Sequence, residues 1–215
     1  MSGLVLLTLV LTYQAIGPSL IAGAPWPSGS SDPSVVNSYF GHGALGSLVL
    51  VQFMTVPPFL LFFFSLRERL SGGGRARFWS TLGLMFVGAE VPLILGGAAL
   101  QGALVSIASR GGDAFPLYRF WDLYWNSAAY LLEASFLFAF AFAMTHSASF
   151  PRWVARLSLV VGGLLGFNVF VVWTGLPPTA ALPANLLFAV WFLTVSIGQL
   201  RLSRSDVPSA HTSAP

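Results

Sequence analysis

Six apolar runs, each close to the roughly 20 residues that a helix needs to cross a bilayer, dominate this chain. They cover Leu4–Ala22, Gly43–Leu66, Phe78–Gln101, Tyr124–Thr145, Leu157–Trp173 and Leu182–Leu202. Only 8% of the 215 residues are charged, against about 25% in a soluble domain. Such a chain lacks the polar surface that a water-soluble globule needs. The sequence therefore predicts an all-α, polytopic integral membrane bundle of six transmembrane helices.

The predicted domain organisation is simple. Residues 1–202 form one transmembrane domain, and the polar segment 203–215 is a disordered cytoplasmic tail. Ala22-Gly23-Ala24 could be a signal-peptide cleavage site, but no basic residue precedes the first run and Pro25 follows the site. We interpret the first run as a retained helix and leave cleavage open.

Missing residue types exclude several kinds of chemistry. Without cysteine, the chain cannot form disulfides, thiolate nucleophiles or cysteine-based metal sites. Without lysine, it cannot form a Schiff base. His42 and His146 fall on opposite sides of the predicted bilayer, so they cannot share a metal ion or a haem. We expect no metal, no cofactor and no nucleic-acid partner.

The arginines predict the orientation in the membrane. Eight of the ten lie in residues 67–77, in the turn 147–156 and in the C-terminal flank, whereas only Arg110 and Arg119 lie on the other side. The positive-inside rule then places both termini in the cytoplasm. The high usage of Arg, Ala and Gly is typical of GC-rich bacterial genomes. We therefore expect a multi-pass protein of the bacterial cytoplasmic membrane.

Two of the seven acidic residues lie near the middle of predicted membrane helices. Glu90 is in the third apolar run and Glu133 in the fourth, so antiparallel packing puts both near the bilayer midplane. A charged carboxylate facing lipid there costs about 2.5–3.5 kcal/mol. Both should therefore face the bundle interior. Two ionised carboxylates without a nearby cation would repel each other, so we expect the pair to hold at least one proton.

Other polar side chains extend this pair into a layer and a stripe. An amide on each of three further helices falls at or near the same depth: Gln14, Gln52 and Asn168. Four residues spaced four, four and three apart share one helical face: Asp122, Asn126, Tyr130 and Glu133. The stripe is either a route for water, protons or substrate, or a polar seam that holds helices together. If polar neighbours bond to Glu133, Glu133→Leu should destabilise the protein, whereas Glu133→Gln should not.

The layout resembles a bacterial family of six-helix membrane proteins that is known only as a domain of unknown function. The shared features are Gly17-Pro18, Leu66-Arg67-Glu68-Arg69 and Ser149-Phe150-Pro151-Arg152-Trp153 before a glycine-rich helix. The resemblance covers most of the chain and implies no activity. The acid pair is also similar to the intramembrane acids of terpene cyclases, although no motif of those enzymes matches.

Three functions remain open. In the first, the bundle binds a small or lipid-like ligand, or relays protons, at Glu90 and Glu133. In the second, an intramembrane enzyme uses one of these acids, assisted by Asp122 and Tyr130, as a general acid on an apolar substrate such as an isoprenoid. In the third, the protein is an accessory subunit of a membrane complex or a homo-oligomer. The predicted ligand-binding residues are Gln14, Gln52, Asn126 and Asn168.

Overall fold

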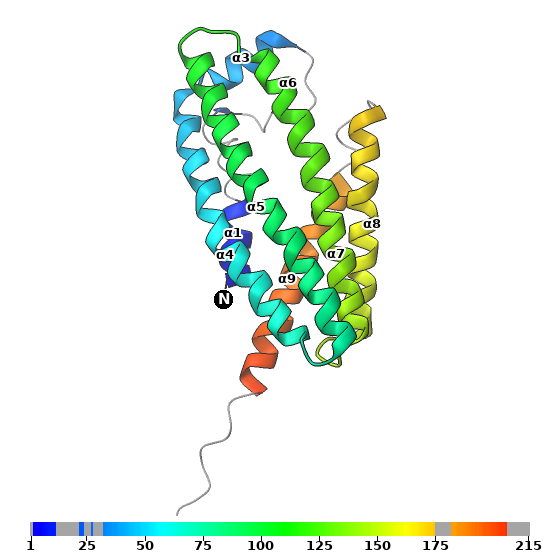
Figure 1. Cartoon of the computed structure of the whole chain (residues 1–215). Helices are drawn as coiled ribbons and strands as arrows, with labels where there is room; N and C mark the ends of the chain where they lie inside the picture. The colour runs from blue at the N-terminus through cyan, green and yellow to red at the C-terminus, as the bar shows by residue number, and fades with distance from the viewer. Residues whose placement is uncertain (1, 12–21, 24–26, 28–31, 175–181, 206–215) are drawn as a thin grey trace, which may run out of the picture.

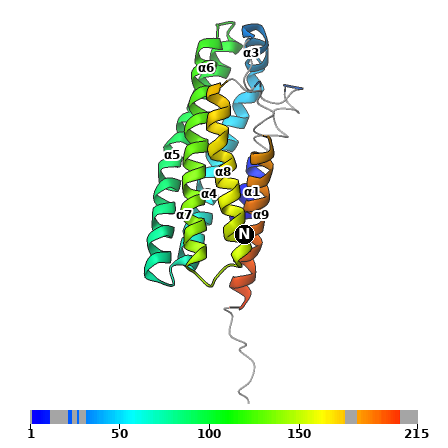
Figure 2. The same cartoon turned by 90° about the vertical axis from the view of Figure 1, so that its right-hand side faces the viewer.

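The protein is an elongated bundle of helices (Figures 1 and 2). The computed structural model describes residues 2–11, 22–23, 27, 32–174 and 182–205, and within these ranges there is no β-strand. Five segments in this part of the chain are long and apolar enough to cross a membrane: Gly43–Leu70, Gly74–Ser109, Phe115–Thr145, Arg152–Thr174 and Pro183–Leu202. The chain is thus an all-helical, multi-pass membrane protein, as predicted.

A sixth crossing stays a prediction. Only the start of the first apolar run is described, as the ten-residue helix α1 (Ser2–Leu11). The rest of that run up to position 21, with Gln14, lies outside the described residues, as does most of the tail.

The remaining elements follow one another with short connections. They are α3 (Pro33–Phe40), the 3-10 turn η2 (Gly43–Leu45), α4 (Gly46–Leu70), α5 (Gly74–Ser109), α6 (Phe115–Tyr124), the π turn η3 (Trp125–Ala129), α7 (Tyr130–Thr145), α8 (Arg152–Thr174) and α9 (Leu182–Ser205). The elements α6, η3 and α7 form one continuous spanning helix. Three features were not predicted: helix α3, the extension of α5 and α6 beyond their apolar runs, and the π turn.

The two ends of the bundle differ in charge. We call one the arginine-rich end, after Arg67, Arg69, Arg75, Arg77, Arg152, Arg156 and Arg201. The other is the cap end, where α3 lies beside the start of α6 (Figure 2). There Asn37 donates from Nδ2 to Asp113 Oδ1 (2.9 Å) and accepts from the Ala114 amide (2.8 Å). These bonds fasten α3 to the residues that begin α6.

Two apolar clusters are stacked along the bundle. The main cluster, towards the arginine-rich end, includes Phe59, Phe62, Phe63, Val87, Phe136, Phe140, Leu165 and Trp191. The cap cluster includes Val36, Phe40, Leu45, Leu48, Leu104, Tyr118 and Trp121. Trp125 packs against both. Because α5 has 36 residues, it is about 54 Å long and exceeds the ~30 Å hydrocarbon core.

Candidate functional site

Glu90 lies in the middle of the buried face of α5. It follows Val87 and precedes Ile94 on that face, and it is 5% exposed. This spacing of three and four residues is the helical repeat that keeps all three side chains on one side. Glu90 is therefore held in the bundle interior by apolar neighbours on its own helix.

Contacts between α5 and α7 place Glu133 opposite Glu90. A Cβ on Gly83 would lie 3.0 Å from the ring of Phe140, so these two positions face each other. The helices are antiparallel, and seven positions after Gly83 lies Glu90, whereas seven positions before Phe140 lies Glu133. Seven residues are about two turns, which returns each side chain to the same face. The two carboxyls are close enough to interact electrostatically.

Neither carboxyl has a basic partner or a hydrogen bond among the described residues. No arginine occurs in residues 46–66, 78–109, 120–151 or 157–200. Glu90 Oε2 is buried and without a partner in the described part of the chain. Glu133 is partly buried. The expectation that polar neighbours bond to Glu133 is therefore wrong for the neighbours that the structure describes.

The predicted stripe on the spanning helix is interrupted by the π turn η3. Within η3, Asn126 donates from Nδ2 to Asp122 Oδ1 at 2.8 Å, towards the cap end. Beyond it, Tyr130 accepts from Asn185 Nδ2 at 3.2 Å. Tyr130 is near enough to Glu133 and Asp122 to interact electrostatically with both, and its hydrogen bond is the one from Asn185. Single π turns within α-helices are frequent at functional sites.

Asn168 lies near the level of Glu133, slightly towards the cap end. Gly166 of α8 packs on α7, where its added Cβ would lie 3.8 Å from the Cβ of Ala134. Two residues further along α8, which is antiparallel to α7, Asn168 reaches the level of Leu132, two residues before Ala134. Asn168 is 1% exposed, and its Nδ2 has no partner among the residues that the structure places.

Gln52 is not level with the pair, and that prediction is wrong. Its Nε2 lies 3.8 Å from the position of a Cβ on Gly97, which is seven residues, or about two turns, from Glu90 on α5. That prediction takes the depth of each polar residue from the ends of its apolar run. Because α4 and α5 continue past these runs to Leu70 and Ser109, the ends of the runs do not set the register.

Four buried polar atoms around this site lack a partner within the described ranges. They are Gln52 Oε1, Glu90 Oε2, Ser127 Oγ and Asn168 Nδ2. Burying such an atom without a hydrogen bond costs about 1–3 kcal/mol. These atoms, two acceptors, one donor and one hydroxyl, are available to water or to a hydrogen-bonding ligand.

Aromatic rings close the site towards the arginine-rich end. Phe63 stacks on Phe140 with ring centroids 5.4 Å apart and on Trp191 at 6.3 Å. Phe136 packs edge-on against Phe63 at 4.8 Å. All four side chains are buried, and Trp191 Nε1 donates to Ser158 Oγ at 2.7 Å. The polar stripe therefore runs from the acid pair towards the cap end.

Sequence reasoning missed two members of this site, Ser127 and Asn185. Asn185 could have been found, because it is the amide nearest the start of the sixth apolar run. Ser127 belongs to the π turn, for which the sequence gives no local signal. Among the described residues, no group of three His, Cys, Asp or Glu side chains could hold a metal ion. No protein-family model, curated protein or solved structure matches this chain.

Proposed function

We propose that the Glu90–Glu133 pair takes up protons from the cap end of the bundle and relays them within a bacterial cytoplasmic membrane. One observation carries this proposal. Two carboxyls face each other without a basic partner in the described spans, and the polar residues Tyr130, Asn126 and Asp122 follow Glu133 towards the cap end. The arginine-rich end is the cytoplasmic one on the positive-inside rule, so protons arrive from the other side.

The chemistry of the pair suits proton exchange. Two ionised carboxylates at low dielectric repel each other strongly, so the pair keeps one proton. A group that holds a proton reversibly can pass it to a hydroxyl or a water within hydrogen-bonding reach. Tyr130 and the unpartnered atoms of Ser127 and Gln52 offer such steps towards the cap end. The aromatic rings of the main cluster oppose free passage to the cytoplasm, which favours a proton-loading site over an open channel.

The same geometry supports a small or lipid-like ligand at the pair as the related alternative. Such a ligand would donate a hydrogen bond to Glu90 and accept one from Asn168. The isoprenoid enzyme receives less support, because the rings next to the acids pack against one another rather than line a space. In an accessory subunit, the polar residues would only hold the helices together. The following experiment distinguishes this role from a proton relay.

Carbodiimide labelling tests the relay. Dicyclohexylcarbodiimide reacts with protonated carboxyls in apolar surroundings, and the adduct is located by mass spectrometry of peptides. In proteoliposomes of known orientation we expect an adduct at Glu90 or Glu133, formed faster as the pH on the cap side falls. Glu68, which is exposed and paired with Arg67, is the internal control and should stay unmodified.

Two results would contradict the proposal. One is a labelling rate that follows the pH on the arginine-rich side, which would place the route at the wrong end. The other is no labelling of either acid at any pH at which the protein stays folded. Glu90→Gln and Glu133→Gln variants identify the modified residue, since an amide does not react.

A further inference from the structure

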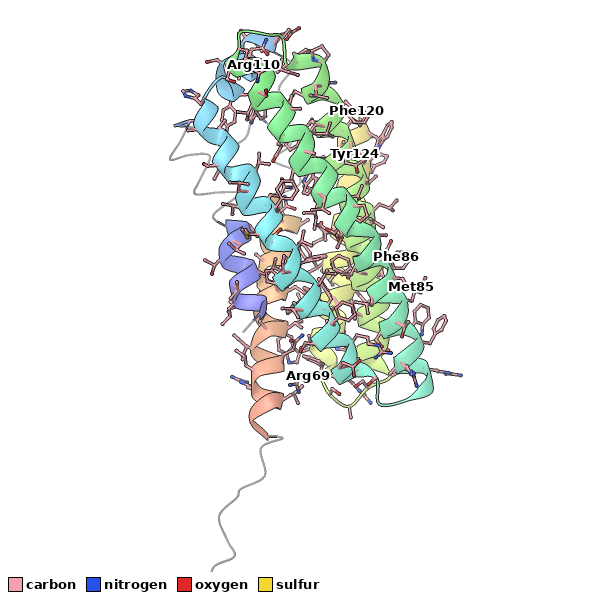
Figure 3. All side chains as sticks on the ribbon, turned by 60° about the vertical axis from the view of Figure 1, so that its left-hand side comes forward. Arg69, Met85, Phe86, Arg110, Phe120 and Tyr124 are labelled. Carbon is pink, nitrogen blue, oxygen red and sulfur yellow. The ribbon has the colours of Figure 1, made fainter. Side chains whose placement is uncertain are left out.

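A shallow groove runs along the outer face of α5, away from the buried face that holds Glu90. Its volume is about 350 Å³. The residues that line it are Gly74, Arg77, Phe78, Thr81, Leu82 and Met85. Figure 3 shows Met85 at the edge of the bundle, on the side away from α1. The groove therefore opens to the surroundings of the bundle and not to its interior.

The spacing of these residues places them on one side of the helix. They follow one another at intervals of three, one, three, one and three residues, which is the pattern of a single helical face. The opposite face of the same segment holds Ala76, Ser80 and Gly83, which are buried against the bundle. Phe78 and Met85 are 61% and 67% exposed, so no described part of the chain covers the groove.

The groove has a positive charge that no described residue balances. The guanidinium of Arg77 makes no hydrogen bond or ion pair within the described part of the chain. The lining contains no carboxylate, and Glu68, the acid nearest to Arg77 in the sequence, is paired with Arg67. One turn beyond Arg77, the hydroxyl of Thr81 also has no partner among the described residues. A guanidinium beside a hydroxyl donor suits phosphate oxygens.

The position of the groove favours a membrane lipid as the source of that phosphate. Helix α5 is long and apolar enough to cross a membrane, and residues 78–89 carry no charge. From Arg77 to Met85 the groove extends about 12 Å along the helix axis, which is less than half of the ~30 Å hydrocarbon core. Arginine side chains near the ends of membrane helices extend towards the membrane surface. An acyl chain of one leaflet can therefore follow the groove while its phosphate stays beside Arg77.

We propose that this groove binds an anionic phospholipid, with the phosphate at Arg77 and one acyl chain between Phe78 and Met85. The Thr81 hydroxyl donates a hydrogen bond to an oxygen of the lipid headgroup. The open space at Gly74, where a Cβ would meet nothing within 4 Å, leaves room for that headgroup. This inference does not depend on proton uptake at the acid pair, or on which side of the membrane the arginine-rich end faces.

Photocrosslinking from a labelled lipid tests the proposal on the intact protein in phosphatidylcholine vesicles. Two probes, one a phosphatidylglycerol and one a phosphatidylcholine, carry the same diazirine in an acyl chain, and mass spectrometry of peptides locates the adducts. We expect the phosphatidylglycerol probe to label residues 78–85 about fivefold more than the other probe. This ratio corresponds to about 1 kcal/mol, the contribution of one arginine near an anionic headgroup.

Three variants separate the contributions of charge and shape. Arg77→Gln should make the two probes label the groove equally. Arg75→Gln is the matched control and should keep the fivefold preference, because Arg75 is exposed on the same helix and does not line the groove. Thr81→Trp fills the groove without removing a charge, so it should lower labelling by the phosphatidylglycerol probe. If Arg77→Gln does not fold, unchanged labelling of Thr81→Trp would overturn the proposal.

Three outcomes with the lipid probes would also overturn it. Equal losses of preference in Arg77→Gln and Arg75→Gln would show a general attraction to the charged end of the bundle. Equal labelling of the wild-type groove by the two probes would remove the role of the anionic headgroup. Competition by soluble glycerol phosphate at the concentration of the probe would assign the groove to a soluble phosphate ester instead.

A second copy of the chain is the competing occupant of this face. Because the chain has no cysteine, Met85→Cys introduces a single thiol at the end of the groove. We expect this variant to stay monomeric in the same vesicles under mild oxidation. A disulfide-linked dimer that forms in high yield would show that α5 packs against a second copy there, and not against a lipid.

Discussion

Replacing Glu90 with methionine should stabilise the protein and abolish proton uptake. Glu90 is buried among apolar side chains, and its Oε2 has no hydrogen-bond partner in the described part of the chain. Methionine has nearly the same length and shape and adapts to irregular packing. The change therefore removes a costly polar group without opening a cavity.

The size of the effect follows from that missing hydrogen bond. A buried acceptor without a partner costs about 1–3 kcal/mol, and Glu90→Met recovers this amount. It also removes the repulsion between Glu90 and Glu133. Glu90→Gln should change stability much less, because its amide remains buried among the same neighbours. Residues at functional sites are often kept at such a cost in stability.

Unfolding in mixed micelles, followed by tryptophan fluorescence, measures these differences. Glu68→Met is the control: Glu68 is exposed and its ion pair is on the surface, so its loss should cost at most about 1 kcal/mol. A Glu90→Met variant that is less stable than the wild type by 1 kcal/mol or more would refute the reasoning. It would mean that the carboxyl is held by a favourable partner.

Three further predictions concern other parts of the bundle. Gly97→Leu should destabilise the protein by about 1–3 kcal/mol through overpacking, because a Cβ at this position would lie 2.6 Å from the indole ring of Trp125. Gly88→Leu on the same helix is the control: a Cβ there meets nothing within 4 Å, so the variant should be tolerated in the same unfolding assay. The hydrogen bond from Asn37 is the main cause that lowers the pKa of Asp113 below its ordinary 3.8. This carboxylate therefore stabilises the cap end above pH 3.8, and the stabilisation is lost as the pH falls through the lowered pKa. As the pH falls through this pKa, backbone amides at the start of α6 should exchange hydrogen faster. In Asn37→Ala, which already lacks the hydrogen bond, the same fall in pH should cause no further increase. A reporter inserted after Gly112 should read as non-cytoplasmic, and a cytoplasmic signal would reverse the orientation.

The opposed positions of Glu90 and Glu133 could be predicted because the bilayer thickness fixes the length of each apolar run. An apolar run of about 20 residues has a middle, and two antiparallel neighbours share it. Because each acid lies near the middle of its own apolar run, the sequence predicts that Glu90 and Glu133 are neighbours, without any information on side-chain packing. The same reasoning was wrong for Gln52, because the register between α4 and α5 depends on contacts such as that of Gln52 with Gly97.

Helix α3 and the π turn required other kinds of signal. Asp32 followed by Pro33 is a helix start, with the Asp32 carboxylate accepting from the Ser34 amide at 2.8 Å. This signal for α3 was readable in the sequence. The π turn was not, because it arises where Trp125 packs on Gly97 between the main and the cap clusters. Contacts between distant segments decide it, and no local pattern carries them.

The hydrogen bonds of the site argue against a purely adhesive role. A polar seam that serves to hold helices together gains stability by pairing its own atoms, as Asn185 and Tyr130 do. Glu90 and Asn168 do the opposite, since both are buried with a polar atom that has no partner among the described residues. Each such atom raises the free energy of the folded state by about 1–3 kcal/mol, against a net stability of about 5–15 kcal/mol for a typical protein. Apolar side chains at these positions would hold the helices together better. The proton exchange that we propose would account for the carboxyl at position 90.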